Sequence, residues 1–392
     1  MLTTNTFNVT FGDFIESKYQ NRITTKFIHA SDIHLGSYQF RNEYRADDYI
    51  RAFQEILELA ISYHVDFIIL GGDVFTSLEM LPSKLIKIIN LLKDFYNYTK
   101  KTISIIAIEG NHDIRRFSRG IRFKQRAQSW LKLLASLELI ILLDADLDAS
   151  PKEMFKSYNF KTRKGGKIKI KNVVIYGTRY LGEKPVTHLS KIRKGIKNND
   201  ELFHILIQHF GIEGQMKNVP GINVKYIEHL KHRIDYLALG HFHKQFIIDD
   251  WIYNPGSPEA VCSIDNSFKR GVFLVEVIKG QQFAKKVKSI KLNNRSYQWK
   301  TLFFPNSLRN RFELYKFTIQ KLKNSFENNN KNLELDSSKM PILYLILKGS
   351  KPHSYKINEK ELSKLIIENI PVVDVNIYQK LKNTSNLLDQ YL

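Results

Sequence analysis

The stretch KFIHASDIHLG, residues 26–36, is an apolar run that ends directly in an aspartate and a histidine, Asp32 and His34. Four later stretches repeat an apolar run followed by aspartate, asparagine or histidine: DFIILGGD (66–73), ISIIAIEGNHD (103–113), FHILIQHFG (203–211) and DYLALGHFH (235–243). Continuous apolar runs of this length are typical of strands covered on both faces. We therefore predict five buried strands, each followed by a polar loop.

Segments with helical spacing separate the first three of these strands. Ile50, Phe53, Leu57 and Ala60 recur at intervals of three or four residues. The stretch PSKLIKIINLLKDFY (82–96) begins with a proline, which is favoured in the first turn of a helix. Strands that alternate with helices predict an α/β fold. In such sheets ligands bind beyond the carboxyl ends of the strands, so we expect the polar loops to converge.

The polar loops carry candidate metal ligands. The stretches SDIHLG (31–36), GGDVF (71–75), GNHD (110–113), IQHFG (207–211) and GHFH (240–243) together offer seven ligands across five loops. Carboxylate, imidazole and amide oxygen suit a divalent ion such as Mn²⁺, Fe²⁺ or Zn²⁺, and the absence of thiolates from the loops argues against a structural zinc site. Seven ligands exceed the need of one four-coordinate ion, so the set favours two ions that share a carboxylate. Taken singly, each loop has an ordinary interpretation as a turn that contains these residues.

The composition indicates a basic globular protein. Its 392 residues predict one large domain and a smaller one. The net charge of +21 favours a polyanionic partner, either nucleic acid or an anionic surface, although a generally lysine-rich composition would give the same excess. No apolar run is long enough to span a membrane, and the N-terminus lacks the pattern of a signal peptide. Because Cys262 is the single cysteine, no intrachain disulfide forms; we expect a cytoplasmic or nucleoid-associated protein.

The character of the chain changes after about residue 280. The stretch FAKKVKSIKLNNRSYQWK (283–300) is basic, and an asparagine-rich connector (326–332) follows it. Three segments then read as strand, helix and strand: ILYLILKG (342–349), EKELSKLIIENI (359–370) and VVDVNIY (372–378). We predict an N-terminal extension of unassigned role (1–25), a large domain (26–278), a small α/β domain (279–382) and a tail (383–392). Four lysines of the basic stretch are candidate DNA contacts: Lys285, Lys286, Lys288 and Lys291.

The ordered motifs resemble the calcineurin-like metallophosphoesterase superfamily, and within it the SbcD-type DNA exonucleases, the relatives of the meiotic recombination nuclease. The stretches that carry the resemblance are KFIHASDIHLG (26–36), GGDVF (71–75), GNHD (110–113), DYLALGHFHK (235–244) and NPGSPEA (254–260). The resemblance implies a β-sandwich flanked by helices as the nuclease domain. The small C-terminal α/β domain is similar, more loosely, to the family's capping domain, which helps hold DNA over the active site.

The resemblance also implies a role for each site residue. Asp32, His34, Asp73 and His243 would bind one ion, and Asp73, Asn111, His209 and His241 would bind the other. His112 would not be a ligand but would face the scissile phosphate, stabilise the developing charge and protonate the leaving oxygen. Chemistry alone agrees on these roles, because a two-metal site needs no protein nucleophile whereas the leaving oxygen benefits from a nearby acid.

The activity that the resemblance implies is that of a Mn²⁺-dependent DNA nuclease, a 3′→5′ exonuclease on duplex DNA and an endonuclease on single strands or hairpins. It would act as a homodimer beside an SbcC-type, SMC-like ABC ATPase in DNA end processing and repair. An alternative is a stand-alone metallophosphodiesterase or phosphatase acting on nucleotides or proteins. The motifs GGDVF and GNHD disfavour the protein phosphatases, which read GD-x-x-D and GNHE. A catalytically inactive scaffold is disfavoured because every ligand position is filled.

Two features depart from the family pattern. Thr76 stands where many members carry a histidine or an aspartate, so we expect an effect on rate or substrate preference. The chain has only residues 383–392 after the capping-like domain, where relatives often carry a helical segment that docks on the ATPase. We expect that docking element to be short, relocated or missing.

Overall fold

The computed structural model describes residues 23–114, 117–118, 121–122, 129–197, 199–305, 307–308, 310–327, 340–350 and 356–382. Nearly all of the N-terminal extension, most of the asparagine-rich connector and the C-terminal tail therefore lie outside the described residues. The described residues form two compact units. The first comprises those up to Ser37 together with Tyr49–Leu292, and the second comprises Tyr38–Asp48 and those from Asn293 onward.

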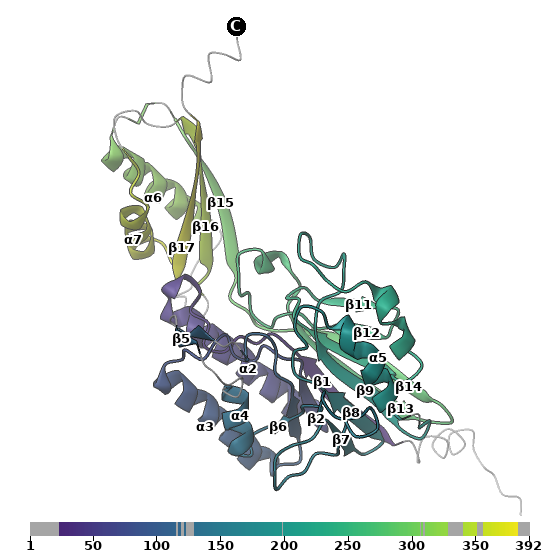
Figure 1. Cartoon of the computed structure of the whole chain (residues 1–392). Coiled ribbons are helices and arrows are strands. Elements are labelled where there is room, and N and C mark those ends of the chain that lie inside the picture. The colour runs from purple at the N-terminus through teal and green to yellow at the C-terminus, as the bar shows by residue number, and fades with distance from the viewer. Residues whose placement is uncertain are drawn as a thin grey trace, which may run out of the picture. The chain divides into compact units, whose positions relative to one another are not determined.

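Two six-stranded sheets build the first unit (Figure 1). The order in the first sheet is β14 (Phe283–Lys291), β13 (Gly271–Lys279), β1 (Thr24–Ala30), β2 (Phe67–Leu70), β3 (Ser104–Ala107) and β6 (Ile141–Leu142). The order in the second sheet is β11 (Phe246–Ile248), β12 (Ile252–Asn254), β10 (Tyr236–Gly240), β9 (Phe203–His209), β8 (Val173–Gly177) and β7 (Lys167–Ile170). The five predicted strands are β1, β2, β3, β9 and β10, which confirms that prediction.

The two sheets pack face to face around a shared core. Buried side chains from the first sheet, such as Phe27 and Ile69, belong to the same cluster as Ile205 and Tyr253 of the second. The central strands β2, β9 and β10 have both faces covered, because helices pack on the outside of the sheets. This explains why the sequence of these strands is apolar without alternation.

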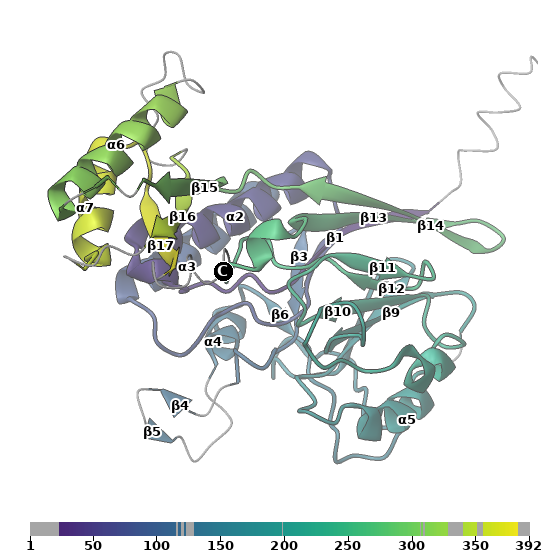
Figure 2. The ribbon, with the colours of Figure 1, turned by 90° about the horizontal axis from the view of Figure 1, so that it is seen from above.

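Helices cover the outer face of each sheet (Figure 2). Side chains of α2 (Glu43–Ser62), α3 (Pro82–Thr99) and α4 (Trp130–Ser136) pack with residues of the first sheet, whereas α5 (Val186–Gly195) packs with the second. The predicted sandwich flanked by helices is therefore confirmed. A small hairpin of β4 (Phe117–Ser118) and β5 (Ile121–Arg122) follows β3. No helix among the described residues is long and apolar enough to cross a membrane.

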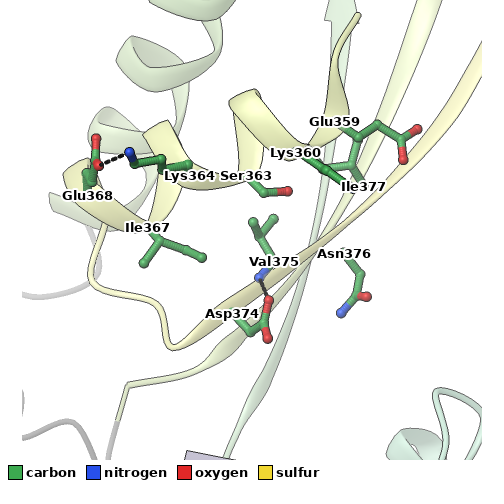
Figure 3. Close-up of a pocket in the computed structure, with 10 residues that line it drawn as sticks. All are labelled: Glu359, Lys360, Ser363, Lys364, Ile367, Glu368, Asp374, Val375, Asn376 and Ile377. Carbon is green, nitrogen blue, oxygen red and sulfur yellow. Dashed lines mark hydrogen bonds and ion pairs between the residues drawn. The ribbon is translucent and has the colours of Figure 1, made fainter. Parts of the chain in front are cut away.

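A three-stranded parallel sheet forms the second unit, in the order β15 (Tyr297–Phe304), β16 (Ile342–Ser350) and β17 (Asp374–Lys382). Two helices, α6 (Arg311–Glu327) and α7 (Glu359–Asn369), pack on one of its faces. A groove of about 660 Å³ runs between α7 and β17 (Figure 3). The predicted strand, helix and strand are β16, α7 and β17, and the structure adds β15 and α6 before them.

The boundary between the units lies later than the sequence analysis placed it. Residues 279–292, predicted to open the small domain, group with the first unit, because β14 pairs with β13 along its whole length and Leu292 is buried in the first core. The change to a basic composition marks the partly exposed edge strand β14 of the first unit and not the start of the second. The second unit also takes in residues 38–48, which the sequence analysis had placed in the large domain.

A buried ion network ties residues 38–48 to the rest of the second unit. The carboxylate of Asp48 accepts two hydrogen bonds from Arg295, at 2.6 and 2.8 Å, and a third from Arg45. The side chains of Arg45 and Asp48 are fully buried, and that of Arg295 is 1% exposed. One carboxylate therefore accepts hydrogen bonds from two guanidinium groups that are buried away from water.

We predict that Asp48→Asn lowers the free energy of unfolding of the second unit by about 3 kcal/mol, because it leaves two buried cations without their shared anion. Urea denaturation followed by tryptophan fluorescence measures this, with Trp299 of β15 as the reporter in the second unit. The matched control is Glu361→Gln, which removes the half-exposed pair with Arg311 and should cost less than about 1 kcal/mol. Equal effects of the two changes would refute the prediction.

Candidate metal centre

The carboxyl ends of the predicted strands meet at one edge of the sandwich. Asp32 and His34 follow β1, Asp73 follows β2, and the loop after β3 carries Asn111 and His112. From the second sheet, His209 is the last residue of β9, and His241 and His243 follow β10. A hydrogen bond between the Nδ1 of His209 and the carbonyl oxygen of Gly71, 2.8 Å, joins the two sheets at this edge. The structure thus brings all seven predicted ligands and His112 together.

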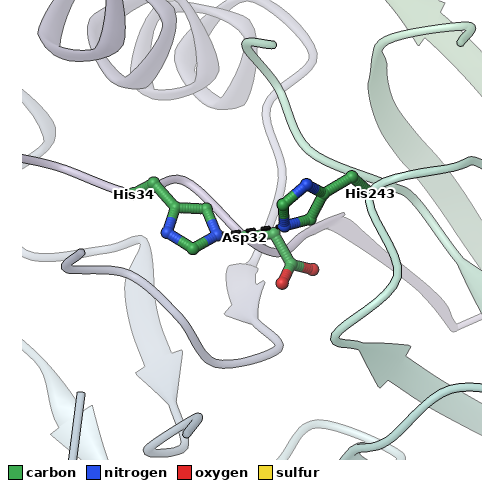
Figure 4. Close-up of side chains that lie close together, drawn as sticks. All are labelled: Asp32, His34 and His243. Carbon is green, nitrogen blue, oxygen red and sulfur yellow. Dashed lines mark hydrogen bonds between the residues drawn. The ribbon is translucent and has the colours of Figure 1, made fainter. Parts of the chain in front are cut away.

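One cluster of possible ligand atoms consists of Asp32, His34 and His243 (Figure 4). The Nε2 atoms of His34 and His243 face each other across 3.2 Å. The Nδ1 of His243 lies 2.7 Å from the carboxylate of Asp265 and donates its hydrogen there, which directs the Nε2 lone pair into the cluster. Two ring nitrogens in this position require a shared proton or a cation, so the geometry fits a metal ion.

A second cluster consists of Asp73, His209 and His241, and Asn111 adds an amide oxygen. The Oδ1 of Asn111 lies 3.1 Å from the Nε2 of His209 and 3.0 Å from the Nδ1 of His241. Asp73 also groups with His34 and His112. Asp73 is therefore the carboxylate between the two ligand sets, as expected of a residue shared by two ions.

Burial and the neighbouring charges set the protonation of these groups. Burial lowers the pKa of His34 to about 3 and that of His241 to about 4, so both rings are neutral at pH 7 and offer a lone pair. Burial also disfavours the cation of His209, but the charge and hydrogen bond of Asp73, together with Asp32 and the carbonyl oxygen of Gly71, outweigh it and raise the pKa of His209 to about 9. Burial would raise the pKa of Asp73, yet His209, with His34 and His112, holds it well below its ordinary value.

Four of the candidate ligands have a strained backbone conformation. Asp32, His34, Asp73 and His241 have positive φ angles of 53°, 54°, 49° and 93°, a region that residues other than glycine seldom adopt. Hydrogen bonds hold the loops in this state: the amide of Asp32 donates to Gly72 and that of His34 to Asp73, both at 3.0 Å. Strain of this kind gathers at functional sites, where the surrounding structure enforces it.

His112 lies beside both clusters and is positioned by the backbone. Its Nδ1 lies 3.0 Å from the carbonyl oxygen of Thr76 and donates there, which leaves its Nε2 directed at the site, 4.0 Å from Asp73 Oδ2. The ring packs edge to face against His34 at 4.8 Å. Its side chain is 23% exposed, whereas those of Asp73 and His209 are buried. His112 is thus more accessible to a substrate than Asp73 and His209 are.

Thr76, the departure noted in the sequence, has a positioning role through its backbone. Its carbonyl oxygen accepts from His112, and its hydroxyl donates to the carbonyl oxygen of His34 at 3.0 Å. The contact to His112 is made by the backbone and needs no particular side chain at residue 76. A threonine in place of the histidine or aspartate of other members therefore leaves this contact to His112 available.

The sequence analysis did not identify Asp265, which is 1% exposed. Besides its bond to His243, its carboxylate accepts from the amides of Val261 and Cys262 at 3.0 and 3.1 Å. No motif signals this role, because Asp265 lies 22 residues from His243 in a loop without a recognisable pattern.

We predict that Asp265→Asn weakens metal binding about 10- to 100-fold, because His243 loses the carboxylate that orients its ring and makes its Nε2 more basic. Isothermal titration of the metal-free protein with Mn²⁺ measures the affinity. The control is Asp249→Asn, an exposed aspartate in the turn between β11 and β12, which should leave the affinity unchanged. An unchanged affinity of the Asp265 variant would show that His243 needs no such support.

The four candidate DNA-binding lysines lie on β14 of the first unit, outside the metal clusters. Lys286 and Lys288 are exposed on one face of the strand. Lys285 points to the other face, where its Nζ is 3.4 Å from the carboxylate of Asp250 and 5.9 Å from the ring of Tyr253. Lys285 therefore already has partners within the fold, which leaves Lys286, Lys288 and the exposed Lys291 as the free candidates.

Comparison with known proteins places the chain in a family. The sequence model of the calcineurin-like phosphoesterases matches residues 25–245, a range that holds all eight site residues. DNA double-strand break repair protein Mre11 of Sulfurisphaera tokodaii is 25% identical over 331 residues, which are 83% of this chain and 74% of that protein. Mre11 of Archaeoglobus fulgidus is 38% identical over 89 residues, 22% of this chain and only 19% of the relative. The uncharacterized metallophosphoesterase YhaO of Bacillus subtilis is 27% identical over 266 residues, 65% of this chain and 58% of that protein.

The family match and the geometry agree on the same edge of the fold. The matched range begins within β1 and ends just after His243, so it encloses the two clusters that share Asp73. The phosphoesterases of this family use a dinuclear metal site, and the donor set described above fits one. We conclude that the chain belongs to the calcineurin-like phosphoesterase family and is a homologue of the Mre11 double-strand break repair proteins.

Proposed function

We propose that the chain is a Mn²⁺-dependent DNA nuclease that hydrolyses phosphodiesters at a two-metal site. It would degrade duplex DNA 3′→5′ and cut single strands or hairpins, as a homodimer with an SMC-like ABC ATPase, in DNA end processing in the cytoplasm or at the nucleoid. The observation that carries the proposal is the pair of clusters that share Asp73, with His112 beside them. The Mre11 relatives support DNA as the substrate.

The residues divide into those that would hold metal and one that would act on the substrate. Asp32, His34, Asp73 and His243 would hold one ion, and Asp73, Asn111, His209 and His241 the other. Two such ions, when bound, polarise the phosphate and activate a water for in-line attack.

His112 would act as the general acid that protonates the leaving group. With its Nδ1 hydrogen held by the carbonyl of Thr76, only Nε2 is directed at the site. A proton on Nε2 can pass to the leaving 3′-oxygen as the P–O bond breaks, which leaves His112 neutral until solvent returns the proton. Before that step, the same proton stabilises the negative charge that grows on the phosphate.

The net charge of +21 supports a substrate that is gripped through its phosphates. We predict that DNA binding falls steeply with salt, by about 10³-fold between roughly 50 and 200 mM if about six phosphates are contacted, and shows little sequence preference. Fluorescence anisotropy with two duplexes of unrelated sequence, each at several salt concentrations, measures this. Binding that ignores salt or favours one sequence strongly would contradict it.

The test of the proposed function is cleavage of end-labelled duplex and hairpin DNA by the full chain with Mn²⁺, with a chelator, and with and without a cognate ATPase and ATP. Cleavage that requires Mn²⁺ supports the nuclease. Hydrolysis of bis-nitrophenyl phosphate without cleavage of DNA, with or without the ATPase, would favour a stand-alone phosphodiesterase. Failure to bind Mn²⁺ at all would favour an inactive scaffold.

A further inference from the structure

The helices α6 and α7 cover one face of the sheet of the second unit. On the other face the ring of Phe40 packs edge to face against Tyr344 at 6.3 Å, while Trp299 and Phe303 remain exposed. Alternate residues of β16, Leu343, Leu345 and Leu347, pack with α6 and α7. Successive side chains of a strand point to opposite faces, so Tyr344 and Lys348 point away from the helices. The parallel register places further residues on that same face. We call this the aromatic face; it comprises Trp299, Phe303, Tyr344, Lys348, Tyr378 and Lys380.

Rings stack across the strands on this face, and Tyr297, two residues before Trp299, also stacks on Tyr344 at 5.9 Å. The ring centroids of Trp299 and Tyr344 are 4.3 Å apart with planes 13° from parallel, and those of Tyr344 and Tyr378 are 6.0 Å apart at 26°. Tyr344 in the middle is buried, whereas Trp299 is 51% exposed and Tyr378 is 39% exposed. Because Trp299 lies on the edge strand β15, the stack ends in a large aromatic ring that is open to solvent.

Positive charge adjoins the stack. In the next row of the sheet, Phe303 pairs with Lys348, and Lys348 pairs with Lys380. The Nζ of Lys348 lies 5.6 Å from the ring centroid of Phe303, which is 67% exposed, and Lys380 is exposed. Asp374, at the opposite end of β17, already accepts a hydrogen bond from Asn42 at 3.1 Å. The carboxyl-terminal end of the aromatic face is thus basic.

The groove between α7 and β17 (Figure 3) offers a contrast within the same unit. Glu359 and Glu368 line it together with Lys360 and Lys364, and Lys364 lies 3.9 Å from Glu368. Its charges are mixed and it has no aromatic ring among its lining residues. Of the two surfaces, only the aromatic face combines exposed rings with an excess of lysine.

We propose that the aromatic face binds single-stranded DNA, with an unpaired base stacked on Trp299 and the neighbouring phosphates at Lys348 and Lys380. Stacking on an aromatic side chain accepts any base, because every base has a π-face. Duplex DNA hides these faces within its own stack and cannot bind in this way. The choice of DNA over RNA rests on the proposed function, and the face would hold the unpaired strand of a frayed end or hairpin.

The test uses the full chain in a chelator, so that binding is measured without cleavage and its outcome is separate from that of the nuclease assay. The ligands are a thymidine oligonucleotide longer than the roughly 4–16 nucleotides of one such site, its abasic counterpart, an RNA counterpart, and a duplex of equal length. The variants are Trp299→Ala and Trp299→Phe. The control is Phe312→Ala, which removes a 75% exposed aromatic ring from α6. Thermal unfolding checks that each variant is folded.

The expected result is that Trp299→Ala raises the Kd for the single strand roughly 5- to 100-fold, while Trp299→Phe and Phe312→Ala change it little. The Kd for the duplex and for the abasic strand should stay within about twofold, since neither offers a base to stack. The single strand should also quench the fluorescence of the wild type, because the other two tryptophans, Trp130 and Trp251, are less exposed. Trp299→Phe should abolish that quenching while it retains binding.

Three outcomes would overturn the proposal. An unchanged Kd for the single strand in Trp299→Ala would exclude stacking on this ring. An equal loss of duplex and single-strand binding would show that the ring supports the fold or a general electrostatic surface. Tighter binding of the RNA than of the DNA strand would assign the face to RNA.

Discussion

Replacement of Asp73 by asparagine is expected to abolish metal-dependent hydrolysis, with a loss of about 10³-fold or more, because one change removes a charged ligand from both ions. Asp73 stands between the two clusters, and its Oδ2 lies 3.3 Å from the Nε2 of His209. The amide oxygen of asparagine can still accept the hydrogen bond that Asp73 Oδ1 takes from the backbone of His112 at 2.7 Å. The loop should therefore keep its shape while the bridging charge is lost.

Metal analysis and rate measurements on the same preparation check this expectation. The Asp73 variant should retain less than two equivalents of Mn²⁺, and excess Mn²⁺ should not restore the rate of bis-nitrophenyl phosphate hydrolysis. The matched control, Asp148→Asn, changes an exposed aspartate of the same unit and should behave as wild type. Two bound ions and a normal rate in the Asp73 variant would rule out a shared carboxylate.

The second large effect is expected from His112→Ser, which should lower the rate of DNA cleavage about 10²- to 10⁴-fold while both ions stay bound. The ions should stay bound because His112 would act as a general acid and would not be a metal ligand. The structure fits this, because its side chain is 23% exposed and its Nδ1 hydrogen is directed to the carbonyl of Thr76. The loss should be smaller for a substrate such as bis-nitrophenyl phosphate, whose leaving group needs no acid.

The control for this variant is His232→Ser. His232 is exposed and precedes the amino end of β10, whereas the site follows its carboxyl end. The informative alternative is that His112→Ser loses an ion. His112 groups with His34 and Asp73 closely enough to act as a ligand, so a loss of bound Mn²⁺ would reassign His112 from acid to ligand.

Much of this site was predictable because buried parallel strands have a recognisable sequence, an apolar run followed by polar residues. The run at 67–70 is apolar throughout and that at 203–207 mostly so, since both faces of these strands are covered, and the polar residues that come next mark the sheet edge where ligands bind. The polar loops were identified in this way, the resemblance of their motifs named the seven candidate ligands and His112 within them, and the structure brings these residues together. The sandwich and its flanking helices were likewise predicted, through the resemblance of those same motifs.

Other features were not predictable, because they depend on contacts between distant residues. Asp265 orients His243 from a loop with no pattern of its own, and the burial that makes this contact matter comes from the packed fold. Asp48 sits in the first turns of α2 yet belongs to the second unit, because Arg295 reaches it across 247 residues of chain. The lysines of β14 suggested the start of a new domain, although β14 is the edge strand of the first sheet and pairs with β13.

The sequence by itself determined which chemical groups this protein has, in what order, and at the ends of which strands, because strand periodicity and ligand type are local properties. Only the tertiary structure decided that Asp73 lies between two sets of ligands, that a backbone carbonyl holds His112, and that Trp299, Tyr344 and Tyr378 form one stack. Each of these depends on the register and packing of strands that are far apart in the chain. Register is set by the burial of whole faces, and no short stretch of sequence contains that information.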